Sequence, residues 1–363
     1  MFTSRVTDIL QIKYPIIQAG MAGAITTPEL VAAVSNSGGL GTLGAGYMSP
    51  EKIREAIYKI RQLTDKPFGV NLLVTKEIQI EKEKVNEAKV LLSGMSRELG
   101  IEEDEFKLPQ SYKEQLQVLL EEKVPVVSFA FQTLEQEEIN VLKRRGIKVI
   151  GTATHVAEAK ALAELGVDMI TGQGSEAGGH RGTFIGKEQD AMIGTFALIP
   201  QLVAAVSHIP IVAAGGVMNG KGLVAALALG AEGVQMGSAF LTSEESITHD
   251  VHKEAILQST DTSTTVTRAF SGRYARGIRN TFIEKHEGKE DRLPMYPVQN
   301  ALTSKIRQEA AKQNKEEYMS LWAGQASSLA RIESAQHVVE RVMKEAENAI
   351  EQLENVYRKR PLE

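Results

Sequence analysis

The chain has 363 residues, of which 42% are hydrophobic, and a formal net charge of −5 at pH 7. This length allows one large domain or two smaller ones, and the apolar content excludes a disordered chain. The mild charge gives no indication of nucleic acid or an anionic membrane as a partner. The chain has no cysteine, which excludes disulfides and thiolate chemistry and fits a cytoplasmic location.

Short apolar strands alternate with helical segments from the N-terminus onward. Strands are predicted within residues 14–20, 39–46 and 68–74. A helix follows each of the first two, capped by Thr26 or Thr27 in one case and by Ser49 in the other. Proline comes directly after the cap in both helices, at a position where its missing N–H costs nothing. The order strand, helix, strand indicates parallel strand pairing.

Residues of about 76–123 interrupt this alternation. They are rich in Glu and Lys and carry helical patterns. Barrel folds commonly grow by such loops, so we expect a helical insertion at the surface that covers one face.

The alternation then resumes and supplies five more strands. They are predicted within residues 124–131, 147–154, 167–174, 209–217 and 231–241. The strands lack polar alternation, as expected for a parallel sheet that is buried on both faces. Eight such units predict an α/β fold of the (β/α)8 TIM barrel type over residues 1–245, and a doubly wound open sheet is the alternative.

Three stretches need a separate interpretation. Residues 191–220 carry no charged side chain, but Pro200 and other breakers favour a buried helix and strand over a membrane span. The polar residues 246–330 are expected to form a small, mainly helical domain or lid. An apolar stripe within residues 331–363 predicts a helix that packs back on the barrel, with a homodimer contact as the alternative.

Glycines end the last two predicted strands of the barrel, where TIM barrels build their active sites. Gly215 and Gly216 end the seventh strand, and Gln235, Met236, Gly237 and Ser238 end the eighth. Backbone N–H groups can approach a phosphate closely only where no Cβ intervenes. A helix that starts after Ser238 would add a favourable dipole. We therefore expect a phosphate-binding site here, and tight turns are the alternative reading.

The segment GSEAGGHRG at residues 174–182 carries the clearest signal for chemistry. Gly178 and Gly179 let the backbone pass close to a flat ligand. His180 follows on a loop beyond a strand end, with Arg181 beside it. A histidine in this place can donate a hydrogen bond to an anion or transfer a proton near neutral pH. A purely structural histidine is the alternative, and no metal-ligand cluster is apparent.

Several segments together resemble the nitronate monooxygenase family, formerly called 2-nitropropane dioxygenases. They are PIIQAGMAG, FGVNLLV, GQGSEAGGHRG, IPIVAAGGV, GVQMGSAFL, FSGRYARGIRN and WAGQASSLA, which span nearly the whole chain. The resemblance implies an FMN bound without a covalent link, with Gly20 and Met21 along its ring and Asn71 and Gln173 hydrogen-bonded to it. It also implies His180 as the active-site histidine. The groups that would hold the FMN phosphate are Gly178, Gly215, Gly216 and residues 235–238.

The activity that the resemblance implies is oxidation of alkyl nitronates, such as propionate 3-nitronate, with O2 to carbonyl compounds and nitrite. His180 would bind the nitronate oxygens, and it acts as a base in members that accept neutral nitroalkanes. The alternative is the related FMN-dependent enoyl-acyl-carrier-protein reductase, which uses NAD(P)H. The residue after its histidine is usually apolar, so Arg181 favours nitronate oxidation. A flavin-binding protein without turnover is a third interpretation.

Overall fold

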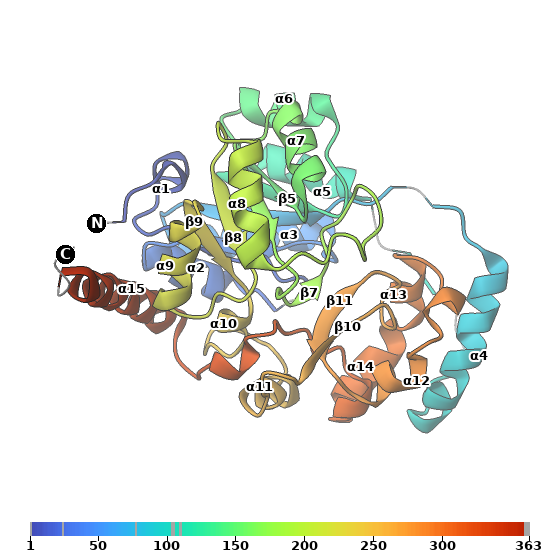
Figure 1. Cartoon of the computed structure of the whole chain (residues 1–363). Helices are drawn as coiled ribbons and strands as arrows, with labels where there is room; N and C mark the ends of the chain where they lie inside the picture. Colours follow the sequence, from blue (N-terminus) through green and yellow to red (C-terminus); the bar gives the residue numbers. More distant parts are fainter. Residues whose placement is uncertain (1, 24, 77, 103–105, 109–110, 359–363) are drawn as a thin grey trace.

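The computed structural model of the chain describes residues 2–23, 25–76, 78–102, 106–108 and 111–358. Its main sheet has eight strands in the order β1-β9-β8-β6-β5-β4-β3-β2 (Figure 1). A parallel bridge between Ile17 and Leu40 joins the first strand to the last and closes the sheet. The predicted (β/α)8 barrel is therefore confirmed. The strands are β1 (Ile16–Gln18), β2 (Gly41–Gly44), β3 (Phe68–Leu73), β4 (Val126–Ala130), β5 (Lys148–Ala153), β6 (Met169–Gln173), β8 (Ile211–Ala214) and β9 (Gly233–Met236).

Helices surround the barrel and begin where the sequence provides caps. The Thr27 hydroxyl accepts a hydrogen bond from the backbone of α2, and the Ser49 hydroxyl does the same for α3. Proline is the first residue of both helices, as predicted. The surrounding helices are α2 (Pro28–Asn36), α3 (Pro50–Leu63), α5 (Tyr112–Glu121), α6 (Gln136–Arg144), α7 (Val156–Leu165), α8 (Thr195–Ala205) and α9 (Gly220–Ala228).

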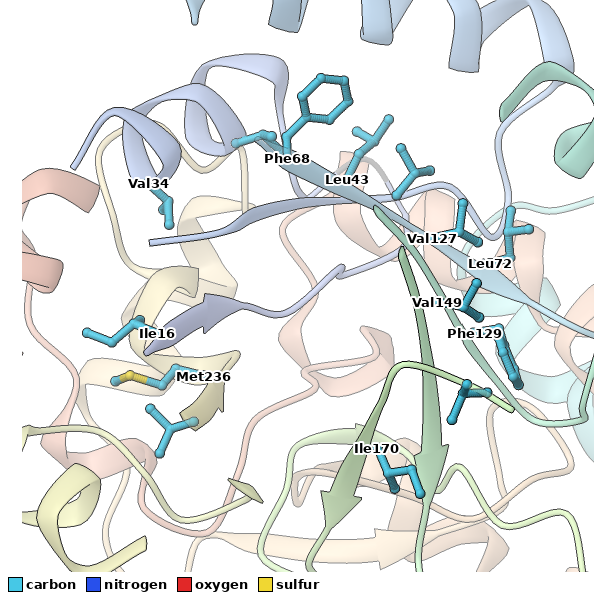
Figure 2. Packing of buried hydrophobic residues seen from close by; sticks show 14 of the residues in the cluster. Ile16, Val34, Leu43, Phe68, Leu72, Val127, Phe129, Val149, Ile170 and Met236 are labelled. Carbon is cyan, nitrogen blue, oxygen red and sulfur yellow. The ribbon is translucent and has the colours of Figure 1, made fainter. Parts of the chain in front are cut away.

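Side chains alternate along each barrel strand between two apolar layers. The larger layer faces the helices and includes Ile16, Leu43 and Met236, which lie along the strands in Figure 2. The smaller layer fills the barrel interior and includes Ile17 and Val126. Helix α1 (Arg5–Leu10) adds Val6 and Leu10 to this inner layer, at the amino ends of the strands. The end of the barrel at the amino ends of the strands is thus filled, which leaves the end at the carboxyl ends of the strands for a binding site.

A second domain with its own core follows the barrel. The rings of Phe270 and Phe282 stack in this core with their centroids 4.2 Å apart. The domain is mainly helical, but it also contains two strands that the sequence analysis did not predict. Its elements are α11 (Asp250–Leu257), β10 (Thr264–Thr267), β11 (Ala275–Ile278), α12 (Thr281–His286), η1 (Glu290–Arg292), α13 (Val298–Leu302), α14 (Ser304–Lys312), η2 (Glu316–Tyr318) and η3 (Ser327–Leu329).

The insertion at residues 76–123 divides between the two cores. Helix α4 (Lys82–Glu98) lies beside the second domain in Figure 1 and buries Leu92 and Met95 in that domain's core. Helix α5 returns to the barrel and buries Leu116 against it. The first half of the insertion therefore extends the second domain, whereas we expected a cover for the barrel. Residues 77, 103–105 and 109–110 of this insertion lie outside the described part of the chain.

A two-residue strand links the barrel to the second domain. β7 (Gly179–His180) leaves the loop after β6 and pairs with β11, opposite Ala275 and Arg276, in a three-stranded sheet with β10. We expected His180 on a free loop. The backbone of this loop is instead fixed by antiparallel pairing with a strand almost a hundred positions later in the chain.

The C-terminal helix α15 (Ala335–Arg358) packs on the outside of the barrel, against α9 and α2. Val339 and Val342 are buried in the barrel's outer core. The approach to α9 is close, because a Cβ on Gly220 would lie 2.1 Å from the backbone nitrogen of Ala346. The stripe continues past the barrel, where Leu353 is exposed. Among the described residues, no helix combines the length and the apolarity needed to cross a membrane.

Candidate active site

A cavity of about 380 Å³ lies at the carboxyl ends of the barrel strands, where the second domain covers them. The barrel contributes residues at or just beyond the carboxyl ends of its strands, and the second domain contributes side chains such as Arg307. The cavity brings together nearly all of the residues that the sequence analysis assigned to the site. Those that line it are Gly20, Met21, Asn71, Gln173, Gly178, His180, Gly215, Gly216, Gln235, Gly237 and Ser238.

Met236 is the exception, because it does not line the cavity. Its side chain is 1% exposed and packs in the layer between the barrel and the helices (Figure 2). Side chains alternate along a strand, so Gln235 and Met236 must face opposite sides of β9. Since Gln235 lines the cavity, Met236 is directed away from it.

The loops after β8 and β9 present unused backbone donors to the cavity. Gly215 and Gly216 adopt φ angles of 111° and 74°, which side-chain-bearing residues rarely adopt. In the described part of the chain, the N–H groups of Gly215, Gly216, Gly237 and Ser238 donate to no acceptor. These four donors suit an anion with several oxygens. Helix α10 (Ser238–Leu241) has only 4 residues, so its dipole adds little.

Two other glycines are required by close packing around the cavity. A Cβ on Gly20 would lie 2.5 Å from the Cβ of Asn71, and a Cβ on Gly178 would lie 2.5 Å from the backbone nitrogen of Gly324. That nitrogen donates a 2.8 Å hydrogen bond to the Ser238 hydroxyl. The loops after β6 and β9 therefore meet the segment around Gly324, and this segment completes one wall of the cavity.

The amide side chains predicted to contact a flavin already have protein partners. Asn71 donates to the Ser128 hydroxyl at 2.9 Å. The Gln173 amide donates to the backbone oxygen of His180 at 2.9 Å and accepts from the backbone nitrogen of Gly182 at 2.8 Å. Gln173 thereby ties the end of β6 to the segment that carries the histidine.

The His180 ring lies among aromatic side chains at the cavity wall. Its centroid is 5.5 Å from that of Phe131, 5.3 Å from that of Trp322 and 6.1 Å from that of Tyr296. The Nε2 atom is buried and has no hydrogen-bond partner among the described residues. A buried polar atom without a partner is costly in a folded protein, so Nε2 is available to a ligand.

The surroundings of His180 keep its imidazole neutral. Burial lowers the pKa of His180 to about 3, and the positive charges of Arg273 and Arg307 act in the same direction. A neutral imidazole can accept a proton at one nitrogen and donate a hydrogen bond from the other. The two guanidinium groups also give the cavity a positive potential, which favours an anionic ligand.

Arg181 does not reach the cavity, although it follows His180 directly. Its side chain is fully buried, and its guanidinium donates to the backbone oxygens of Gly174 at 2.6 Å, Gln173 at 2.9 Å and Ala191 at 3.0 Å. In an extended segment, neighbouring side chains face opposite ways, which explains the inward turn. Arg181 therefore fixes the loop after β6, and its side chain makes no contact that could discriminate between substrates.

Several residues that line the cavity were not predicted from sequence. Phe131 directly follows β4 and Thr152 lies near the carboxyl end of β5, so position at a strand end could have identified them. Tyr47 lies in the loop after β2, where the same signal applies, whereas Arg307 and Trp322 come from the second domain and no local pattern marks them. In the described ranges, no three His, Asp or Glu side chains converge as metal ligands.

Comparisons with known proteins agree over the whole length of this architecture. The family model described as nitronate monooxygenase matches residues 3–345. A probable nitronate monooxygenase of Staphylococcus saprophyticus is 49% identical over 348 residues, which covers 95% of this chain and 98% of the relative.

Solved structures show the same likeness. A nitroalkane oxidase from Streptomyces ansochromogenes is similar with a TM-score of 0.90 and 39% identity, and the match covers 96% of this chain and 100% of that one. FabK from Thermotoga maritima is similar with a TM-score of 0.77 and 34% identity, over 98% of this chain and 100% of that one. With its barrel, its second domain and its cavity residues all inside the matched region, the chain belongs to the nitronate monooxygenase family.

Proposed function

We propose that the chain oxidises alkyl nitronates with O2 to carbonyl compounds and nitrite, with FMN as its cofactor. The observation that carries the proposal is the neutral imidazole of His180, whose Nε2 has no hydrogen-bond partner among the described residues. This imidazole lies at a cavity where backbone N–H groups of the described chain are also without acceptors. Family membership supports the reaction class.

The lining of the cavity fits FMN at both of the cofactor's ends. Gly215, Gly216, Gly237 and Ser238 would hold its phosphate, because their N–H groups have no other acceptor in the described chain. Gly20 belongs to the wall along the flavin ring in this proposal. Bound FMN would accept electrons from the nitronate and pass them to O2.

The protein's own contribution is to bind and orient an anion. A nitronate already carries the charge of a carbanion equivalent, so no strong base is needed to start the reaction. An N–H of the neutral His180 ring would bind a nitronate oxygen, and the charges of Arg273 and Arg307 would attract the anion.

The alternative function is an FMN-dependent enoyl-acyl-carrier-protein reductase that uses NAD(P)H. Arg181 no longer separates the two, since its side chain is buried away from the cavity. The choice depends on the family match and on the positive potential around His180, which suits an anion in direct contact with the ring.

Turnover and cofactor release test the proposal together. Purified protein should be yellow, release FMN on heating, and consume O2 with nitrite formation when propionate 3-nitronate is added. Protein that stays colourless after incubation with FMN would contradict the cofactor. Rapid reduction of the flavin by NADH, followed by reoxidation with a crotonyl thioester, would establish the reductase instead.

A further inference from the structure

The cavity contains a guanidinium that enters the proposed chemistry at His180 only through its charge and binds no group of the substrate there. Arg307 lies on α14, and its Nη2 donates to the backbone oxygen of Asn300 at 2.7 Å and to the side-chain oxygen of Asn300 at 3.0 Å. Its Nε donates to the Thr303 hydroxyl at 3.3 Å. These contacts fix the guanidinium at the cavity wall. Nη1 has no acceptor in the described part of the chain, so it is available to a ligand.

No carboxylate balances the charge of Arg307 within the described residues. The groups that interact with it electrostatically are the phenols of Tyr47 and Tyr296, while burial lowers the pKa of Arg307. Burial raises the pKa of both tyrosines, so they stay neutral and cannot serve as counter-charges. A guanidinium remains charged in proteins, so the cavity wall holds a cation without a counter-ion.

The other guanidinium near His180 shows the contrast. Arg273 lies 3.3 Å from the carboxylate of Glu188 and donates to the backbone oxygen of Arg181 at 2.8 Å. Its charge is therefore balanced by a protein group. A partly buried cation that lacks such a group is costly unless a ligand supplies the negative charge.

We propose that Arg307, with the hydroxyl of Tyr47, forms a second anion subsite that binds a carboxylate at the far end of the nitronate. This inference rests on the proposed function and names its substrate class. The planar guanidinium suits a carboxylate, and the neutral phenol adds a donor. Arg307 is thus the residue that selects carboxylate-bearing nitronates over uncharged alkyl nitronates.

A pair of substrates tests this selection. Propionate 3-nitronate carries the carboxylate, and propyl-1-nitronate lacks it at similar length. Replacing Arg307→Met should lower kcat/KM for propionate 3-nitronate by about 10- to 100-fold, the effect of one charge-assisted hydrogen bond, and mainly through KM. The value for propyl-1-nitronate should fall by less than about 3-fold, because this substrate loses only the long-range attraction of the Arg307 charge. Arg307→Lys should restore part of the preference. Arg279→Met, which removes an exposed guanidinium paired with Glu287 at 3.4 Å, is the matched control.

Ligand binding gives a readout that needs no turnover. The chain has one tryptophan, Trp322, and it lines the same cavity. Succinate resembles propionate 3-nitronate in charge and length, so it should change the Trp322 fluorescence, with an affinity that Arg307→Met weakens by about 10- to 100-fold.

The outcomes separate the subsite from the proposed function. Succinate binding that depends on Arg307, in protein that oxidises no nitronate, would support the subsite and refute the function. Nitronate oxidation with the same substrate preference in wild type, Arg307→Met and Arg307→Lys would overturn the subsite alone. Equal melting temperatures of the Arg307→Met variant, the Arg307→Lys variant and the wild type exclude misfolding as the cause of a loss.

Discussion

At the scale of single residues, the protonation state of His180 determines what the site can do. Its pKa is lowered to about 3, so the ring stays neutral well below the range in which a solvent-exposed histidine gains a proton. A neutral imidazole can accept a proton, and it can bind a nitronate oxygen through a hydrogen bond without neutralising the negative charge of the nitronate. Burial is the main cause of the lowered pKa of His180, and the charges of Arg273 and Arg307 are the smaller causes.

The pH profile of turnover checks this state. With propionate 3-nitronate, kcat/KM should show no decrease near pH 6.5, the ordinary pKa of histidine, because His180 remains neutral there. Replacing Arg273→Gln removes a positive charge and should raise the pKa of His180, which moves any acid decrease toward higher pH. An inflection near pH 6.5 in the wild type that is lost in His180→Gln would contradict the neutral ring.

Sequence could identify cavity residues where a local signal exists. Gly215 and Gly216 follow a buried strand, and their positive φ angles explain why glycine is found there. The side chain of Met236 lies away from the cavity, because alternation along β9 sends every second side chain to the other face. Arg307 had no local signal at all, because its position depends on how α14 lies over the barrel.

At the scale of elements, the loop after β6 is held by the buried side chain of Arg181. Three backbone oxygens, of Gln173, Gly174 and Ala191, accept hydrogen bonds from this guanidinium, and that of Gly174 also accepts from the backbone nitrogen of Ala177. Gln173 adds a second tie between the end of β6 and the backbone of His180. The loop that carries the histidine is therefore stabilised by hydrogen bonds in place of a hydrophobic core.

Removing this guanidinium should be costly. Replacing Arg181→Met leaves buried oxygens without donors, so the free energy of unfolding should decrease by about 2–4 kcal/mol in urea denaturation. Arg144→Met removes an exposed guanidinium paired with Glu137 and should change it by less than about 0.5 kcal/mol. Equal stabilities of these two variants would show that Arg181 does not hold the loop.

Elements with local signals could be predicted, and elements that depend on distant partners could not. Helices α2 and α3 begin at their predicted caps because Thr27 and Ser49 bond to their own helices. Strand β7 has only two residues and exists because β11 pairs with it. No periodicity can appear in so short a segment, so the sequence indicated a loop there.

At the scale of the whole molecule, histidines that are buried and neutral make stability depend on pH. Burial lowers the pKa of His252 to about 4, and that of His286 is lowered for the same reason. In the unfolded chain these groups gain protons below about pH 6.5, whereas in the folded protein they do not. The unfolded state then binds more protons, so the free energy of unfolding decreases as pH falls from about 6.5 toward 4.

The slope of this loss can be measured by urea denaturation at several pH values. Each buried neutral histidine contributes up to about 1.4 kcal/mol per pH unit, and His252→Gln should reduce the slope by up to that amount. His337→Asn, at an exposed position on α15, should leave the slope unchanged. Identical slopes in the wild type and the His252→Gln variant would refute this account.

The barrel could be predicted as a whole because its strands and helices alternate in order along the chain. The placement of the insertion could not, since the apolar residues of α4, such as Leu92, would fit either core equally well by pattern. The contact of α15 with the barrel follows its predicted stripe as far as Ala346. A homodimer through the exposed remainder, which includes Leu353, stays a prediction.

The pairing of β7 with β11 has a consequence for recombination between relatives. A chimaera that joins this barrel to a relative's second domain would keep His180 in the gene segment of one parent. The strand opposite it, around Ala275, would come from the other parent. With a crossover between the two domains, one parent supplies His180 and the other parent supplies the strand that positions it. Functional chimaeras should therefore be those that inherit β6 to β11 as one block.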